Sequence, residues 1–266
     1  MKDFNYYFGE PNNLYNNILD NMAHTEVHSC ETSSIPLIDF WHPRNEKAIS
    51  QLIDLLGLSI DLDKMQKCFE YPVFAEKNDK QIGRPSMTDL MLLDNQYRIA
   101  IEAKYTEKLY ESIEKWKKNS KKNSNKHDVL TTWYDYIKRY SSYNQSDVHQ
   151  IEHEVVYQFL HRTASACYKC DENGLQPVLV YQLFYNENDE KSKRHQLEVA
   201  CSLKCFAEKF LRFNDKILFF IVFTPLTNVN EVKRKYRRID SGIFLKMKDA
   251  PIYKFGVSSL FTESAE

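Results

Sequence analysis

The chain has few glycines and prolines, six and eight in 266 residues. It also has no internal repeat and no recognisable linker, so we expect a single domain over residues 1–266, with an irregular N-terminal segment at 1–42. No run of about 18 apolar residues is present, as a membrane-spanning helix would need. The first ten residues are polar and acidic, unlike a secretory signal peptide. We therefore expect a soluble, cytoplasmic protein without a membrane partner, and 42% hydrophobic residues provide enough apolar side chains for a core.

Six cysteines without a secretion signal are most simply read as reduced thiols. Cys167 and Cys170 form a C-x2-C pair, and Cys201 and Cys205 form a C-x3-C pair further along the chain. Four thiolates would suit a structural zinc site. The second pair, however, lies in a segment with helical periodicity, where cysteines commonly act as small core residues. We therefore favour structural thiols over zinc.

The net charge of −1 gives no overall basic field for nucleic acid. Basic residues nevertheless gather in two runs: Lys115, Lys117, Lys118, Lys121, Lys122 and Lys126 in the first, and Lys233, Arg234, Lys235, Arg237 and Arg238 in the second. Such runs are often ordinary solvated surface. Two of them in a neutral protein also fit local phosphate contacts. We take all of them except Lys115, Lys126 and Lys235 as candidate nucleic-acid-binding residues.

Periodicity predicts the order of the elements. Residues 1–40 are expected to be irregular apart from a short helix near 14–21. A helix should then begin after Pro43, with Ile49, Leu52, Ile53 and Leu56 on its buried side, and end at Gly57. Three extended stretches follow, at 68–76, 86–93 and 97–104.

The second half alternates helices and strands. Helices are expected from about residue 107, at 129–140 and at 148–167, then strands at 178–185 and 216–223 with a long helix at 192–213 between them. This order predicts an α/β fold with a mixed β-sheet flanked by helices on both faces and a helical insertion at about 107–170.

The hairpin between the second and third strands carries the most informative residues. A turn centred on Asn95 and Gln96 pairs positions that sum to 191, so Asp89 lies directly opposite Glu102. Directly opposed residues share a face of the sheet and stand about 5 Å apart at Cβ. Lys104 projects from the same face because it is two residues beyond Glu102, whereas Leu90 and Ile101 point to the other face.

Two opposed carboxylates repel each other unless a cation lies between them. Hard oxygen ligands with room for water and phosphate describe a Mg²⁺ site, and a nearby ammonium group can orient an attacking water. The alternative is a local ion pair between Glu102 and Lys104 on a solvated face. Met87, Met91 and Ala100 on that face are not polar, which favours the metal site.

Asp89 together with Glu102-Ala103-Lys104 resembles the motif of the PD-(D/E)XK nuclease superfamily, which has the restriction-endonuclease-like fold. The expected order of helix, three-strand meander, helix and strand is similar to that family's core. The resemblance implies that Asp89 and Glu102 bind Mg²⁺, for which Mn²⁺ can substitute. It also implies that the Ala103 carbonyl can add a ligand and that Lys104 positions the nucleophilic water. It leaves open whether one or two metal ions bind.

The resemblance points to two further catalytic candidates. Glu46 matches a glutamate on the first core helix of family members, although an acid in a first helical turn is also favoured by the helix dipole. Gln158 lies in a stretch, 155–162, that resembles a later helix in which a glutamine faces the active site. His153, His161 and His195 have no partner at an informative spacing, and we do not place them in the site.

The resemblance therefore implies a Mg²⁺-dependent endonuclease that hydrolyses phosphodiester bonds of DNA, most simply a restriction-type or phage-defence nuclease. A homodimer is compatible with it, because many members cut both strands by pairing two active sites. Two alternatives remain open: a non-catalytic nucleic-acid-binding or assembly subunit that retains the nuclease fold, and a nuclease subunit of a repair or transposition complex.

Overall fold

The computed structural model describes residues 6–8, 32–107, 109, 111–118, 125–142, 152–212, 214, 216–228 and 250–262. The helix expected near 14–21 lies outside these residues. So do Lys121 and Lys122 of the first basic run and the whole of the second run, including Lys233, Arg234, Arg237 and Arg238.

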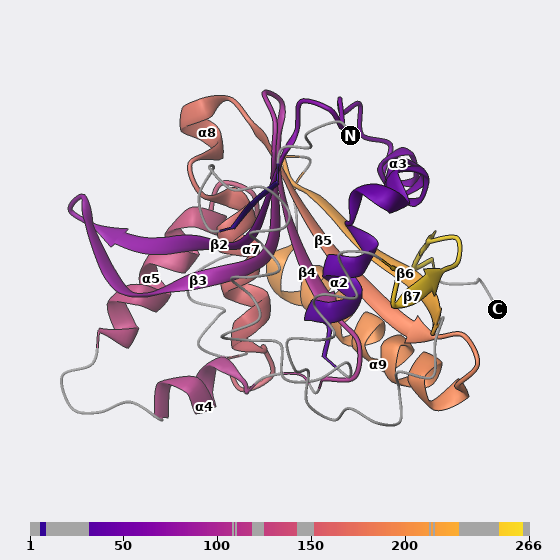
Figure 1. Cartoon of the computed structure of the whole chain (residues 1–266). Helices are drawn as coiled ribbons and strands as arrows, with labels where there is room; N and C mark the ends of the chain where they lie inside the picture. Colours follow the sequence, from indigo (N-terminus) through magenta and orange to yellow (C-terminus); the bar gives the residue numbers. More distant parts are fainter. Residues whose placement is uncertain are drawn as a thin grey trace.

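Eight strands form one mixed sheet in the described part of the chain, in the order β1-β2-β3-β4-β5-β6-β7, with β8 pairing with β6. The strands are β1 (Tyr6–Phe8), β2 (Gln66–Lys77), β3 (Lys80–Leu93), β4 (Tyr97–Lys104), β5 (Gln176–Asn186), β6 (Leu218–Asn228), β7 (Tyr253–Phe255) and β8 (Ser259–Leu260). β2, β3 and β4 form an antiparallel meander, whereas β4, β5 and β6 run parallel to one another. The β2–β3 hairpin extends well beyond the rest of the sheet (Figure 1).

Helices cover both faces of the sheet, as predicted. α2 (Ser34–Phe40) and α3 (Glu46–Leu55) precede the meander, and α4 (Ile113–Lys118), α5 (Lys126–Ile137), α7 (Tyr157–Cys167) and α8 (Cys170–Asn173) connect β4 to β5. α9 (Glu190–Phe206), which continues into a π-helical turn (Ala207–Leu211), connects β5 to β6. The side chain of Asp189 caps α9 by accepting a hydrogen bond from the Lys191 amide at 3.0 Å.

Two apolar clusters lie on opposite faces of the sheet. Ile49 and Leu52 of α3 pack with Leu90 and Ile101 on one face, together with the apolar residues of α2. Met91, Ala100 and Tyr181 on the other face pack against α5, α7 and α9. The central strands are therefore buried on both sides, which explains the nearly continuous apolar sequence of β5. No helix in the described segments is both long and apolar enough to cross a membrane.

The predicted strands and the helix after Pro43 are confirmed, and Gly57 ends that helix with a φ of +67°. β3 begins earlier than expected, at Lys80, because Asn78 and Asp79 adopt positive φ and form a tight turn that extends the hairpin. The short helix α2 was not predicted. With seven residues and a proline in its first turn, it gave no periodic signal.

Two of the expected helices differ in extent from the described ones, and local contacts explain both differences. The helix expected near residue 107 begins at Ile113, because the Glu107 carboxylate accepts hydrogen bonds from the amides of Tyr105 and Thr106 and holds a non-helical turn. The helix expected at 148–167 is helical from Tyr157, where α7 begins, but not at 152–156, and residues 148–151 lie outside the described part of the chain. Val155 and its neighbours pair with residues 111–113 in extended conformation before the helix starts.

Candidate active site

The β3–β4 ladder has the predicted register. Leu90 pairs with Ile101 and Met91 pairs with Ala100, so one further step along both strands brings Asp89 opposite Glu102. The turn fixes this register, because the Asp94 carboxylate accepts hydrogen bonds from the amides of the two residues that close the turn, at 2.7 and 2.5 Å.

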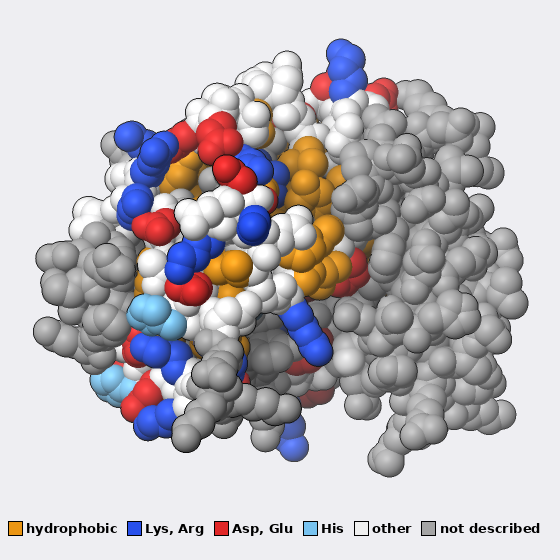
Figure 2. Space-filling model, turned by 90° about the vertical axis from the view of Figure 1, so that its left-hand side faces the viewer, with side chains coloured by type: hydrophobic (Ala, Val, Ile, Leu, Met, Phe, Trp, Pro, Cys, Tyr) orange, Lys and Arg blue, Asp and Glu red, His pale blue; other side chains and the backbone are white. Residues whose placement is uncertain are grey.

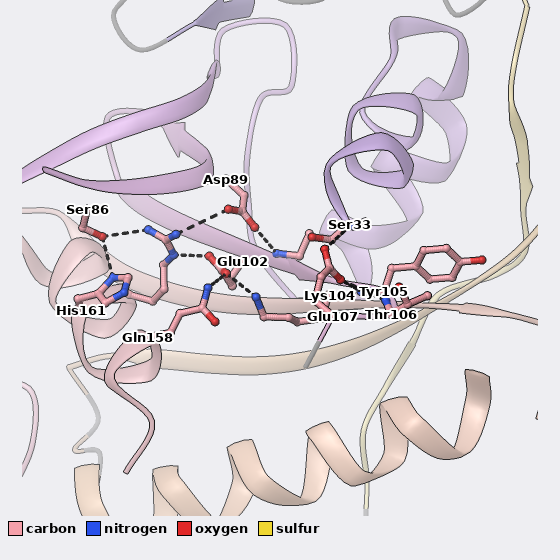
Figure 3. Close-up of polar contacts among 12 residues, drawn as sticks. Ser33, Ser86, Asp89, Glu102, Lys104, Tyr105, Thr106, Glu107, Gln158 and His161 are labelled. Carbon is pink, nitrogen blue, oxygen red and sulfur yellow. Dashed lines mark hydrogen bonds and ion pairs between the residues drawn. The ribbon is translucent and has the colours of Figure 1, made fainter. Parts of the chain in front are cut away.

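Asp89, Glu102 and Lys104 form one cluster at the end of β4 (Figure 3). Lys104 Nζ lies 2.9 Å from Glu102 Oε1, and the Ala103 amide donates a hydrogen bond to Asp89 Oδ2 at 2.9 Å. The Ala103 side chain points to the opposite face and belongs to the core beneath α2 and α3. The three residues on which the sequence hypothesis rests therefore share one site.

Helix α7 supplies two more side chains to this cluster. Gln158 Nε2 donates a hydrogen bond to Glu102 Oε1, in agreement with the predicted orientation of Gln158. Arg162, one helical turn later, donates from Nε to Glu102 Oε2, and its Nη2 lies 3.7 Å from Asp89 Oδ1. Sequence reasoning missed Arg162. Its spacing of four residues from Gln158, which places both on one helical face, was the available signal.

Ser86 and His161 extend the cluster. Ser86 Oγ accepts a hydrogen bond from Arg162 Nη1 at 3.0 Å and lies 2.8 Å from His161 Nδ1. His161 therefore lies beside the cluster, and sequence spacing did not reveal its hydrogen-bond partner because Ser86 is seventy-five positions away. Burial lowers the pKa of His161 well below its usual range, so the imidazole is neutral. The other two histidines lie elsewhere: His153 is exposed beside Glu154, and His195 contacts the backbone carbonyl of Glu107.

The two acids have opposite electrostatic environments. Burial opposes ionisation of Glu102, whose side chain is 1% exposed, but the charges of Arg162 and Lys104 outweigh burial and lower its pKa. Burial and the charge of Glu102 raise the pKa of Asp89 to about 7, even though Arg162 and Lys104 oppose the shift. Neighbouring carboxyl groups with separated pKa values are typical of functional sites.

The cluster lines a cleft of about 790 Å³. Arg84 and Lys126 bring positive charge to its walls, and Trp116 and Tyr157 bring aromatic rings that stack on each other with centroids 3.9 Å apart. On the face seen in Figure 2, basic and acidic side chains of the described residues are interspersed, and they form no single basic area.

The structure does not bring Glu46 to the cluster. Glu46 is exposed on α3, and its charge acts on Lys67 of β2. Lys67 pairs with Leu92 of β3, close to the β3–β4 turn. The physical reason is the packing of α3 on the sheet face of Leu90, whereas Glu102 faces α7. Position on the first core helix was therefore a poor guide for Glu46.

Of the candidate nucleic-acid-binding residues, the structure describes Lys117 and Lys118, and each forms an ion pair with an acid. Lys117 Nζ lies 2.8 Å from Glu152 Oε2, and Lys118 Nζ lies 2.7 Å from Glu114 Oε1. Neither residue lines the cleft. Any contact of these lysines with phosphate would thus compete with ion pairs on the protein surface.

The four cysteines considered for zinc occupy two environments: Cys167 and Cys170 are buried, and Cys201 and Cys205 are exposed on α9. Among the described residues, no three or more His, Cys, Asp or Glu side chains converge as a ready-made metal site. Mg²⁺ requires fewer protein ligands, because it commonly binds through one or two carboxylates and keeps water or phosphate in its other positions.

No curated protein and no solved structure matches this chain. Residues 11–221, which are more than half of the chain, match the family described as a domain of unknown function, DUF6946, and the protein therefore belongs to that family.

Proposed function

We propose that this protein is a Mg²⁺-dependent endonuclease that hydrolyses phosphodiester bonds of DNA on a restriction-endonuclease-like fold. The observation that carries the proposal is the convergence of Asp89, Glu102 and Lys104 across the β3–β4 hairpin, at the edge of a cleft. The order of α3, the β2–β4 meander, the helices and β5 supports the same fold. A restriction-type or phage-defence role and a homodimer that cuts both strands belong to this proposal.

The donor set fits a hard divalent cation. Asp89 and Glu102 offer carboxylate oxygens, and the backbone of Ala103 runs beside them. Burial, followed by the neighbouring charge of Glu102, raises the pKa of Asp89, and a bound cation would favour its ionised form. When bound there, Mg²⁺ would stabilise the negative charge that develops on the phosphate during hydrolysis.

Residues of the chain have distinct roles in this proposal. Lys104 is buried, and although burial opposes its charge, Glu102 and Asp89 raise its pKa, so it stays protonated. It therefore acts as a hydrogen-bond donor that orients the attacking water rather than as a base. Gln158 fixes the orientation of the Glu102 carboxylate through its own hydrogen bond.

The test is cleavage of supercoiled plasmid by the full chain in the presence of Mg²⁺ or Mn²⁺. Asp89→Asn and Lys104→Ala should each lower the rate by about a hundredfold or more, the range found when one electrostatic group of an active site is removed. Glu46→Gln is the matched control, because this exposed acid lies outside the cluster, and it should cut at the rate of the unmodified protein. Equal cleavage by all proteins, or none by any, would show that the proposal is wrong.

One observation favours the non-catalytic alternative, a nucleic-acid-binding or assembly subunit that retains the fold. Arg162 contacts both acids, so the cluster contains two carboxylates and two cations and is neutral without any metal. A calorimetric titration with Mn²⁺ separates the alternatives. Binding that disappears in Asp89→Asn supports the nuclease, whereas the absence of any Asp89-dependent binding supports the subunit.

A further inference from the structure

Arg162 contacts both carboxylates that the proposed metal ion would use, Asp89 and Glu102. Its guanidinium uses Nε on Glu102 Oε2, Nη1 on Ser86 Oγ at 3.0 Å, and Nη2 toward Asp89 Oδ1 at 3.7 Å. The side chain is 6% exposed, so water screens these contacts little. The Arg162 guanidinium would therefore repel a metal ion bound by Asp89 and Glu102.

Both oxygens of Glu102 already have donors. Oε1 accepts from Lys104 and Gln158, and Oε2 accepts from Arg162. Lys104 is held close by the rigid strand β4, only two residues from Glu102, and Gln158 carries no charge. Arg162 reaches the cluster on a long side chain from another element, and its departure would free an oxygen of Glu102 and relieve charge repulsion together.

Ser86 provides Arg162 with a second anchor at the cleft. Ser86 Oγ is held by His161 Nδ1 at 2.8 Å and lies 3.3 Å from Ser165 Oγ. Ser86, His161 and Arg162 all line the cleft. The guanidinium can therefore keep its contact with Ser86 while its other nitrogens turn from the acids toward the cleft.

We propose that Arg162 is an internal counter-ion that competes with the metal ion for Asp89 and Glu102, and that on metal binding it turns into the cleft to bind a phosphodiester oxygen. This inference rests on the nuclease function proposed above. An arginine fork suits two phosphate oxygens at once. The same side chain would thus stabilise the metal-free site and recruit the anionic substrate once the metal is present.

The inference predicts effects of opposite sign from a single substitution. In Arg162→Gln, the affinity for Mn²⁺ measured by calorimetry should increase about tenfold, within the range that groups around metal ligands usually control. Plasmid cleavage at saturating Mn²⁺ should fall by about a hundredfold. Misfolding would weaken both, so tighter metal binding together with slower cleavage cannot arise from a damaged fold.

Two further variants complete the experiment. Arg84→Gln removes the same charge from the same cleft at an exposed position without contact to either acid, and its Mn²⁺ affinity should stay within about twofold of the unmodified protein. Arg162→Lys keeps the charge but not the fork, so its affinity should fall between those of the unmodified protein and Arg162→Gln.

The outcomes separate this inference from the proposed function. Asp89-dependent Mn²⁺ binding that is unchanged or weaker in Arg162→Gln would overturn the competition and leave the nuclease proposal standing. If neither the unmodified protein nor Arg162→Gln binds Mn²⁺ through Asp89, both proposals are wrong.

Discussion

Two isosteric substitutions in the acid pair should change stability in opposite directions. At pH 8.5 without divalent metal, Asp89→Asn should make the fold more stable, and Glu102→Gln should make it less stable. The reason is that Asp89 carries its charge against burial and the charge of Glu102, whereas Arg162 and Lys104 compensate Glu102.

The size of each effect follows from the environment of the side chain. The pKa of Asp89 rises from 3.8 to about 7, and at about 1.4 kcal/mol per unit its ionisation costs the fold roughly 4 kcal/mol at high pH. The side chain is 23% exposed, so we expect about 3 kcal/mol after solvent screening. Loss of the charge of Glu102 leaves two buried cations without their main partner and should cost about 3 to 5 kcal/mol.

The assay is urea unfolding of the three proteins at pH 8.5 and pH 4.5, with a chelator present. Because the folded-state pKa of Asp89 is raised, its unfavourable contribution develops as pH increases from about 4 through 7, so the gain in Asp89→Asn should shrink strongly at pH 4.5. Added Mg²⁺ should stabilise the unmodified protein and not Asp89→Asn. Reduced stability of Asp89→Asn at pH 8.5, or a gain that is equal at both pH values, would refute the reasoning.

Three other predictions concern separate parts of the molecule. Burial raises the pKa of Asp39 to about 6, so its contribution to the free energy of unfolding is complete below pH 4 and decreases by about 3 kcal/mol as pH rises through 6. Urea unfolding of the unmodified protein at pH 4 and pH 8 should show this decrease, and Asp39→Asn should lack it. Gly83 has a φ of +72°, and a Cβ there would lie 3.0 Å from Val129 Cγ2, so Gly83→Ala should lower the free energy of unfolding by about 1 to 3 kcal/mol, and an unchanged value would contradict the strain. Calorimetry should show that the affinity for Mn²⁺ increases about tenfold per pH unit below pH 7 and levels off above it, because a proton must leave Asp89; a flat profile would exclude this coupling.

The sequence by itself determined the local geometry of the site. Alternation of side chains along a strand and the polar turn at Asp94 are short-range effects, so they fixed the β3–β4 register and placed Asp89, Glu102 and Lys104 on one face. The apolar periodicity of α3 and its glycine stop were also local, and both were predicted correctly.

Tertiary structure alone decided which distant residues complete the site. The approach of α7 to β4 brings Arg162 to Glu102, sixty positions apart, and brings His161 to Ser86 across seventy-five. The packing of α3 on the opposite face leaves Glu46 outside. Contacts of this kind depend on how helices pack on the two sides of a sheet, and periodicity shows which face of a helix is buried without showing what it is buried against.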